Sequence, residues 1–276
     1  MSVCLHELIS DFEKKATKAV PIHEKDYEKE GLVYCYKCNT PKQCRQSFFG
    51  NTITVPCLCE CEEKRIQQEK ERERVEKIRG ACISDTRLHS YTFANDNGRI
   101  PEAMSKAKKY VANFDKYFKD GICLLFYGSV GDGKTYAAAS IANALIDIEK
   151  QCLFTDFPQL ARKWEALYAH KEEFLKGLNA YDLLIIDDFG VERQTETMQE
   201  MVHSIIDSRL REGKPMVITT NMTGEELKHP TDIRKERIYS RLLGKSIAHH
   251  CQGEDQRKLN FLEINREFDE QMKNTK

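Results

Sequence analysis

The sequence predicts an α/β fold in which a parallel sheet is covered by helices on both faces, with a smaller cysteine-rich module ahead of it. Short apolar runs alternate with longer helical stretches after about residue 105, which is typical of parallel sheets. One run leads directly into a glycine-rich turn, and most of the cysteines precede residue 62. The strands are expected near residues 122–127, 152–155, 183–187, 216–220 and 246–251.

Composition divides the 276 residues into three parts. Residues 1–61 form an N-terminal region that is cysteine-rich in its second half, residues 62–84 form a linker that is almost entirely charged up to residue 79, and residues 85–276 hold the alternating strands and helices. Acids and bases interleave in the middle part without a continuous apolar stripe. We interpret it as a solvated helical linker rather than a coiled coil or a nucleic-acid-binding helix.

Charge and hydropathy exclude some classes of protein. The chain has 43 Lys and Arg against 44 Asp and Glu, so its formal net charge of −1 neither favours nor excludes a nucleic-acid partner. No apolar run approaches the roughly 20 residues that span a bilayer, and the N-terminus lacks the plan of a signal peptide. We therefore expect a cytoplasmic protein that does not bind membranes, whose 11 cysteines are free thiols or metal ligands.

A complete G-x-x-x-x-G-K-[ST] motif follows the first predicted strand and opens a helix expected over residues 134–149. Its glycines let backbone N–H groups surround phosphate oxygens, which the helix N-terminus also attracts. Lys134 is expected to reach the β- and γ-phosphates and Thr135 to ligate Mg²⁺. The motif predicts a nucleoside triphosphate site, for which the expected cofactor-binding residues are Gly128, Ser129, Val130, Gly131, Asp132, Gly133, Lys134, Thr135 and Tyr136.

A second strand ends in two carboxylates. The run Leu183–Ile186 precedes Asp187 and Asp188, which is the layout of a Walker B strand. Asp187 is expected to hold Mg²⁺, and Asp188 to orient and polarise the attacking water. Many related ATPases carry Glu at the second position, so the shorter Asp favours slow intrinsic hydrolysis.

Further candidates follow the Walker B strand. Asn221 ends the next strand, where a polar side chain can bridge the γ-phosphate and the attacking water; the alternative is an ordinary turn residue. Arg234, Arg237 and Arg241 are spaced three and four apart, so they share one helical face. A fixed guanidinium stabilises charge on a transferring phosphoryl group, often across a subunit interface. The alternative is a solvated basic face.

The cysteine spacing predicts a metal site. Cys35 and Cys38 are followed by Cys57, Cys59 and Cys61, and two short strands around a Gly50-Asn51 turn would bring the thiol pairs together. We expect structural Zn²⁺ on Cys35, Cys38 and two of the last three, with Cys44 spare. Unpaired thiols and an iron–sulfur cluster are the alternatives.

Together these motifs resemble the DnaC/DnaI-type replicative helicase loaders, AAA+ ATPases that also resemble the IstB transposition helpers. The resemblance covers roughly residues 85–260. It implies the AAA+ strand order, Phe93 near the adenine, Asn221 as sensor 1, and an arginine finger from Arg237 or Arg241. The region from Cys35 to Cys61 looks like the zinc-bearing N-terminal region of bacterial and phage members, which implies the helicase contact.

The expected function is therefore that of an ATP-dependent helicase loader. The chain would use ATP, Mg²⁺ and Zn²⁺, form an ATP-dependent homo-oligomer, and deliver a replicative hexameric helicase to single-stranded DNA. Hydrolysis would be slow and stimulated by DNA or the partner. An IstB-like transposition helper and an ATP-gated adaptor that does not hydrolyse are the alternatives.

Overall fold

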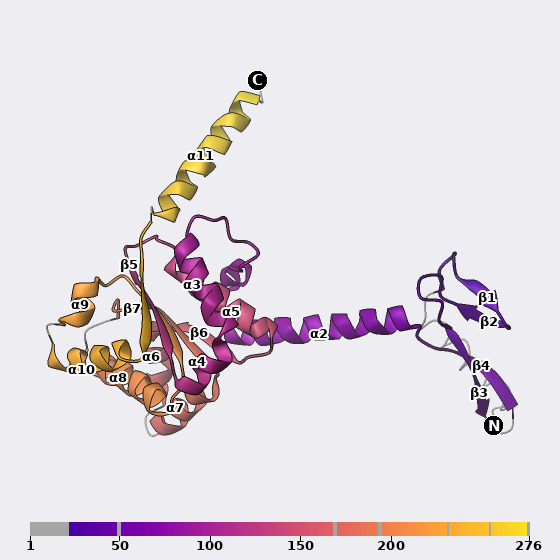
Figure 1. Ribbon diagram of the computed structural model, residues 1–276, viewed down its shortest axis with the longest axis horizontal. Coiled ribbons are helices and arrows are strands. Elements are labelled where there is room, and N and C mark those ends of the chain that lie inside the picture. The colour runs from indigo at the N-terminus through magenta and orange to yellow at the C-terminus, as the bar shows by residue number, and fades with distance from the viewer. Residues whose placement is uncertain are drawn as a thin grey trace. The chain divides into compact units, whose positions relative to one another are not determined.

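The structure, a computed structural model, forms two compact units, Met1–Arg74 and Val75–Lys276 (Figure 1). The division falls within the helix of the charged segment, residues 62–84, which the sequence placed between the two modules. The structure describes residues 22–48, 51–167, 170–192, 195–230, 232–253 and 255–274.

The first unit contains two small antiparallel hairpins. β1 (Tyr27–Lys29) pairs with β2 (Leu32–Tyr34), and β3 (Gln43–Phe48) pairs with β4 (Asn51–Pro56). The second hairpin agrees with the predicted pair of strands, although the Gly50 position of the predicted turn lies outside the described residues. The sequence does not predict the first hairpin, because three-residue strands are too short to show the alternation of apolar and polar residues that is typical of a strand.

The charged segment forms one helix, α2 (Glu60–Cys82). Arg65 pairs with Glu62 at 2.7 Å and with Glu69 at 2.6 Å on its exposed surface, as a solvated helix requires. Its C-terminal part differs from that prediction, because Val75 and Ile78 pack against the core of the second unit. Together with the buried Cys82, these two apolar side chains make the end of α2 part of the second unit.

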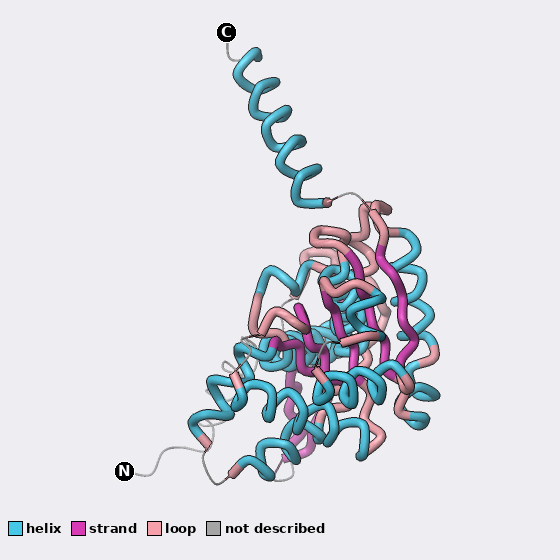
Figure 2. Tube along the Cα trace, turned by 90° about the vertical axis from the view of Figure 1, so that its left-hand side faces the viewer, coloured by secondary structure: helices cyan, strands magenta, loops and turns pink. Residues whose placement is uncertain are grey.

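The second unit is built on a five-stranded sheet in the order β6-β7-β8-β5-β9, and every neighbouring pair is parallel. This confirms the predicted parallel sheet and the AAA+ strand order implied by the resemblance. In Figure 2 the strands run side by side with helices on either side of them. The strands are β5 (Cys123–Gly128), β6 (Cys152–Asp156), β7 (Leu183–Phe189), β8 (Met216–Thr220) and β9 (Ser246–Cys251).

Alternate residues of the strands enter two separate cores. Leu124 and Phe126 face the core that contains the short helix η1 and helices α3 and α5, whereas Cys123 and Leu125 face the core that contains α6 to α10. Both faces are therefore apolar, which explains why the strands appear in the sequence as continuous apolar runs. The remaining helices are η1 (Thr86–Ser90), α3 (Pro101–Ala112), α4 (Phe114–Asp120), α5 (Lys134–Asp147), α6 (Phe157–Ala166), α7 (Lys171–Ala180), α8 (Glu196–Arg211), α9 (Gly224–Lys228), α10 (Ile233–Leu243) and α11 (Gln256–Asn274).

Helices α6 and α7 carry aromatic side chains, which in a protein of this kind can pack in the core or stack on the bases of single-stranded DNA. Trp164 is 3% exposed and packs edge-on against Phe174. Its indole therefore serves the core, while Tyr168 lies outside the described residues. Within the described part of the chain, no helix has the length and apolar character needed to cross a bilayer.

Arg209 is a fully buried arginine on α8. Its guanidinium donates hydrogen bonds to the carbonyls of Leu178 and Tyr181, both at 2.9 Å, and of Pro215 at 2.7 Å. Burial lowers its pKa to about 10, so the side chain remains charged at neutral pH. These bonds tie the end of α7 to the loop before β8.

We expect Arg209→Met to lower the free energy of unfolding by about 3 kcal/mol, because three buried carbonyls would lose their donor. Arg211→Met is the matched control, since the Arg211 side chain is 67% exposed and pairs with Asp207 at the surface. We expect that control to change stability by less than about 1 kcal/mol. Urea unfolding of the two variants measures the difference, and equal effects would contradict the role assigned to Arg209.

Candidate nucleotide site

The phosphate loop connects β5 to α5, as the sequence predicted. Gly131 and Gly133 have φ angles of +86° and +85°, in the left-handed region that side chains disfavour. A Cβ atom at Gly131 would lie 2.0 Å from the Asp255 carboxylate, so this position also needs glycine for space. Gly133 caps the N-terminus of α5, whose unpaired N–H groups point into the loop. The loop can therefore hold phosphate oxygens.

Lys134 is folded back into this loop. Its ammonium group donates hydrogen bonds to the carbonyl oxygens of Ser129 at 2.6 Å and Gly128 at 3.2 Å, and to Asp132 Oδ1 at 2.7 Å. The Lys134–Asp132 pair is almost completely buried, with side chains 4% and 1% exposed. Asp132 Oδ2 has no hydrogen-bond partner. A triphosphate must therefore compete with Asp132 for the lysine.

We expect Asp132→Asn to bind ATP about 10-fold more tightly, or ~1.4 kcal/mol. Asparagine keeps the shape of the side chain but removes the charge that holds Lys134 and repels phosphate. Titration with a fluorescent ATP analogue measures the change, and AMP serves as a control because it lacks the phosphates that Lys134 reaches. Unchanged or weaker ATP binding would show that Asp132 only stabilises the loop.

The two residues expected to hold Mg²⁺, Thr135 and Asp187, lie in contact. Although they are far apart in the sequence, the Thr135 hydroxyl donates to Asp187 Oδ1 at 3.1 Å, and the hydroxyl of Thr219 on β8 donates to the same oxygen. Burial is the largest influence on the pKa of Asp187 and raises it; the Thr219 bond lowers it, and the charge of Asp188 raises it. A divalent cation bound here would favour the ionised carboxylate.

Asp188 and Asn221 lie side by side at the edge of the sheet. Asn221 Nδ2 donates to Asp188 Oδ1 at 3.3 Å, and the Asp188 backbone N–H donates to Thr219 Oγ1 at 2.9 Å. Asp188 has a φ of +53°, an uncommon conformation for a residue other than glycine. Because of this backbone conformation, the carboxylates of Asp187 and Asp188 point in different directions, so that Asp187 can hold the metal while Asp188 faces the cleft.

A cleft of about 700 Å³ joins these residues to a tyrosine pair. Tyr91 and Tyr136 stack with ring centroids 4.8 Å apart, and the Tyr136 hydroxyl donates to the Thr92 carbonyl at 3.0 Å. Phe93 is not among the residues that line this cleft; it packs against the core, with Lys108 over its ring. Tyr91 does line the cleft, so of the two aromatic residues in the sequence Tyr91-Thr92-Phe93 it is the first, and not Phe93, that faces it.

Several lining residues were not predicted from the sequence. Arg87 and Arg99 precede the phosphate loop by many residues in the sequence. Gln256, Arg257 and Asn260 come from α11, the last helix of the sequence. The Gln256 N–H donates to the Gly131 carbonyl at 2.8 Å. No sequence motif marks these positions. Arg87 is paired with Asp85 and Arg99 with Glu263, so a polyphosphate would compete with these carboxylates for the two guanidinium groups.

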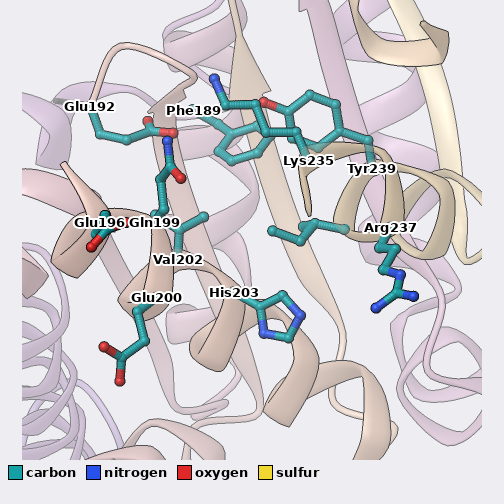
Figure 3. Close-up of a pocket in the computed structure, with 11 residues that line it drawn as sticks. Phe189, Glu192, Glu196, Gln199, Glu200, Val202, His203, Lys235, Arg237 and Tyr239 are labelled. Atoms are coloured by element: carbon teal, nitrogen blue, oxygen red, sulfur yellow. The ribbon is translucent and has the colours of Figure 1, made fainter. Parts of the chain in front are cut away.

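The predicted arginine fingers lie away from this cleft. Arg237 and Arg241 project from α10 and line cavities against α8, not the nucleotide cleft. Arg241 forms an ion pair with Asp207, whereas Arg237 extends from the wall of its cavity in Figure 3. The side chain of Arg234 lies outside what the structure describes. Neither Arg237 nor Arg241 lines the nucleotide site of its own chain.

Four thiols gather in the N-terminal unit. The sulfur atoms of Cys35, Cys38, Cys59 and Cys61 all lie within 4.8 Å of one another. The Cys35–Cys61 and Cys59–Cys61 sulfur distances are both 3.5 Å, close to the about 3.8 Å expected between thiolates around tetrahedral Zn²⁺. The donor set therefore fits zinc.

The two other nearby cysteines lie outside this cluster. The Cys57 thiol donates to the Pro41 carbonyl at 3.5 Å, and its pKa is raised by burial and by Cys44. Within the cluster, the Thr40 hydroxyl is the main cause that lowers the pKa of Cys38 to about 6. Hydrogen bonds with Cys59, Cys35 and Cys38 raise the pKa of Cys61 to about 12.

Comparison with known proteins gives consistent results. Residues 90–245, more than half of the chain, match the model of the bacterial DnaA ATPase domain. The replicative helicase loader DnaC of Escherichia coli K12 is 30% identical over 150 residues, which cover 52% of this chain and 59% of that protein. The replicative helicase loader DnaI of Bacillus subtilis 168 is 26% identical over 164 residues, covering 54% and 53%.

The chain thus spans somewhat over half the length of these curated relatives. Among solved structures, a crystal structure of a DNA replication initiation factor is 21% identical, with a TM-score of 0.50. That alignment covers 65% of this chain and 55% of the other. It shows that the two proteins share a fold.

Proposed function

Because the chain belongs to the family of bacterial DnaA ATPase domains, we propose that it is an ATP-dependent helicase loader that delivers a replicative hexameric helicase to single-stranded DNA. The observation that carries the proposal is the set of Lys134, Thr135, Asp187, Asp188 and Asn221 around one cleft, in a chain similar to two named helicase loaders. ATP and Mg²⁺ bind in this cleft.

In the proposed site each side chain has one task. Lys134 leaves Asp132 and binds the β- and γ-phosphates, while Thr135 and Asp187 hold Mg²⁺. Asp188 accepts a proton from the attacking water, and Asn221, in contact with Asp188, orients that water. Tyr91, rather than Phe93, packs against the base.

The remaining charge on the γ-phosphate is stabilised by an arginine of a neighbouring subunit. Arg237 and Arg241 are both on α10, away from the cleft of their own chain. Arg241 is held in an ion pair with Asp207, so we assign the finger to Arg237. ATP binding then favours assembly of subunits side by side, because each site is complete only at an interface.

The N-terminal unit supplies the contact with the helicase. Zinc on Cys35, Cys38, Cys59 and Cys61 stabilises a unit whose described residues form two short hairpins and the N-terminal part of α2. An independently stabilised unit can bind the helicase while the sheet domain binds ATP and DNA.

We expect Asp188→Asn to lower ATP hydrolysis by about 10²-fold, the lower range for loss of a general base. ATP binding should persist, because Lys134 and Thr135 are unchanged. Single-turnover hydrolysis with DNA and helicase present measures the effect. Equal rates for the two proteins would remove the enzymatic part of the proposal and leave an ATP-gated adaptor.

The loading function is tested with the full chain and the replicative helicase of the same host. We expect a complex between them and faster appearance of helicase on closed circular single-stranded DNA with ATP. Failure to bind the helicase or to change its loading would overturn the proposal. ATP-dependent binding to duplex DNA and stimulation of a transposase would instead support a transposition helper.

A further inference from the structure

Helix α11 carries a row of large apolar side chains that the described part of the chain leaves exposed. Phe261, Ile264, Phe268 and Met272 are 66%, 66%, 60% and 58% exposed. Their spacing of three, four and four residues places them on one face of the helix, which we call the α11 stripe. Leu262 is similarly exposed, at 62%, but lies beside the stripe. A continuous exposed apolar face of this kind marks a binding surface.

The start of α11 is fixed next to the phosphate loop. In addition to the bond between Gln256 and Gly131, Arg99 Nη1 donates to Asn260 Oδ1 at 2.8 Å and pairs with Glu263. Asn260 lies one turn before Ile264, at the margin of the stripe, and Glu263 projects from a different side of the helix. The helix is therefore anchored at the nucleotide cleft while its apolar face remains available.

A groove between α8 and α10 has complementary properties. It encloses a cavity of about 300 Å³ whose apolar walls include Phe189, Val202 and Tyr239. Figure 3 shows the rings of Phe189 and Tyr239 close together, with Glu196 and Glu200 projecting from α8 along one side. We call this the α8–α10 groove.

We propose that the α11 stripe of one copy of this chain docks in the α8–α10 groove of a second copy. The inference rests on the proposed function, in which Arg237 reaches the triphosphate of a neighbouring subunit. Arg237 also lines the groove. When Arg237 contacts the neighbour's triphosphate, the mouth of the groove therefore lies beside the neighbour's phosphate loop. The neighbour's α11 begins at that loop, so its apolar face meets an apolar cavity.

The α8 side of the groove carries charge opposite to that of the first turn of α11. Arg257 and Lys258 are exposed in that turn, and the groove has Glu196 and Glu200 on α8, with Lys235 and Arg237 on α10. Opposite charges at the edge of an interface orient the partners, while the apolar side chains supply most of the affinity. Docking of α11 would thus connect the nucleotide cleft of one subunit with α10 of the next.

The first test compares assembly of three full-length proteins with ATP and Mg²⁺ by sedimentation velocity. We expect Phe261→Ser with Phe268→Ser to raise the concentration for half-assembly at least about 10-fold, because two anchors of the stripe are removed. Leu262→Ser, on the same helix, should assemble like the wild type. ATP binding should be equal in all three, since the changed side chains are exposed and outside the cleft.

The outcomes separate this inference from the proposed function. If the wild type assembles and the double variant assembles equally well, the docking inference alone is overturned. If the wild type shows no ATP-dependent assembly, both the composite site and the docking inference are overturned. Equal loss in Leu262→Ser and the double variant would show a general effect on α11 and would also contradict docking by the stripe.

The second test identifies the occupant of the groove. We expect the photo-crosslinking substitution Phe268→benzoylphenylalanine to give a product of two chains that depends on ATP, attached within α8 or α10. Glu196→Lys with Glu200→Lys should reduce that product. Attachment within the same chain, attachment elsewhere on the second copy, attachment to the helicase, or absence of any product would overturn the proposal.

Discussion

Arg237→Ala should lower ATP hydrolysis by about 10³-fold while leaving ATP binding unchanged, because an arginine finger acts on charge that develops during phosphoryl transfer. The cavity lined by Arg237 is separate from the nucleotide cleft of its own chain, so loss of the side chain removes nothing from the bound ATP there. Equilibrium binding and single-turnover hydrolysis of the same preparation measure the two quantities.

Mixing variants shows whether the finger acts between subunits. Asp188→Asn protein retains Arg237, and Arg237→Ala protein retains Asp188, so hybrid interfaces should recover part of the lost activity. Arg241→Ala is the matched control on the same helix, and we expect a smaller decrease because Arg241 is paired with Asp207. No recovery on mixing would argue against action in trans, and a larger effect at Arg241 would reverse the assignment.

Cys59→Ser is expected to abolish zinc binding and the folding of the N-terminal unit. Binding of structural zinc contributes about 10–16 kcal/mol in small zinc modules, more than a unit with two short hairpins obtains from its core. Metal analysis of freshly purified protein should give about one equivalent for the wild type and much less for the variant. The ATPase domain should still bind ATP.

Cys44→Ser and Cys57→Ser provide matched controls in the same unit. Neither residue belongs to the four-thiol cluster, so both variants should retain their zinc. Loss of zinc in Cys57→Ser but not in Cys59→Ser would mean that a different set of cysteines binds the metal. Substantially less than one equivalent in the wild type would contradict the zinc proposal altogether.

Several features of the fold were predictable because contiguous residues encode them. The five strands occur where apolar runs placed them, and β5, the phosphate loop and α5 follow one another as the G-x-x-x-x-G-K-[ST] motif requires. The carboxylates at the end of β7 were predicted for the same reason. The positions of side chains within a few residues of a strand end are determined mainly by the local sequence and depend little on the rest of the chain.

The division of the chain was harder to predict. The charged composition of α2 indicates a solvated helix, yet Val75 and Ile78 attach its end to the core of the second unit. Composition describes a segment as a whole, whereas the packing of α2 against the core depends on individual side chains and on a surface formed by other elements. A boundary placed by composition therefore differs from one placed by packing.

By itself, the sequence determined that this chain contains a triphosphate-binding sheet domain and a cluster of thiols, since both are written in short local motifs. Only the tertiary structure placed Thr135 against Asp187, put Tyr91 rather than Phe93 at the cleft, and gathered Cys59 and Cys61 without Cys57. The physical reason is that these arrangements depend on packing between elements far apart in the chain. Local patterns specify which residues are available, and packing determines which of them meet.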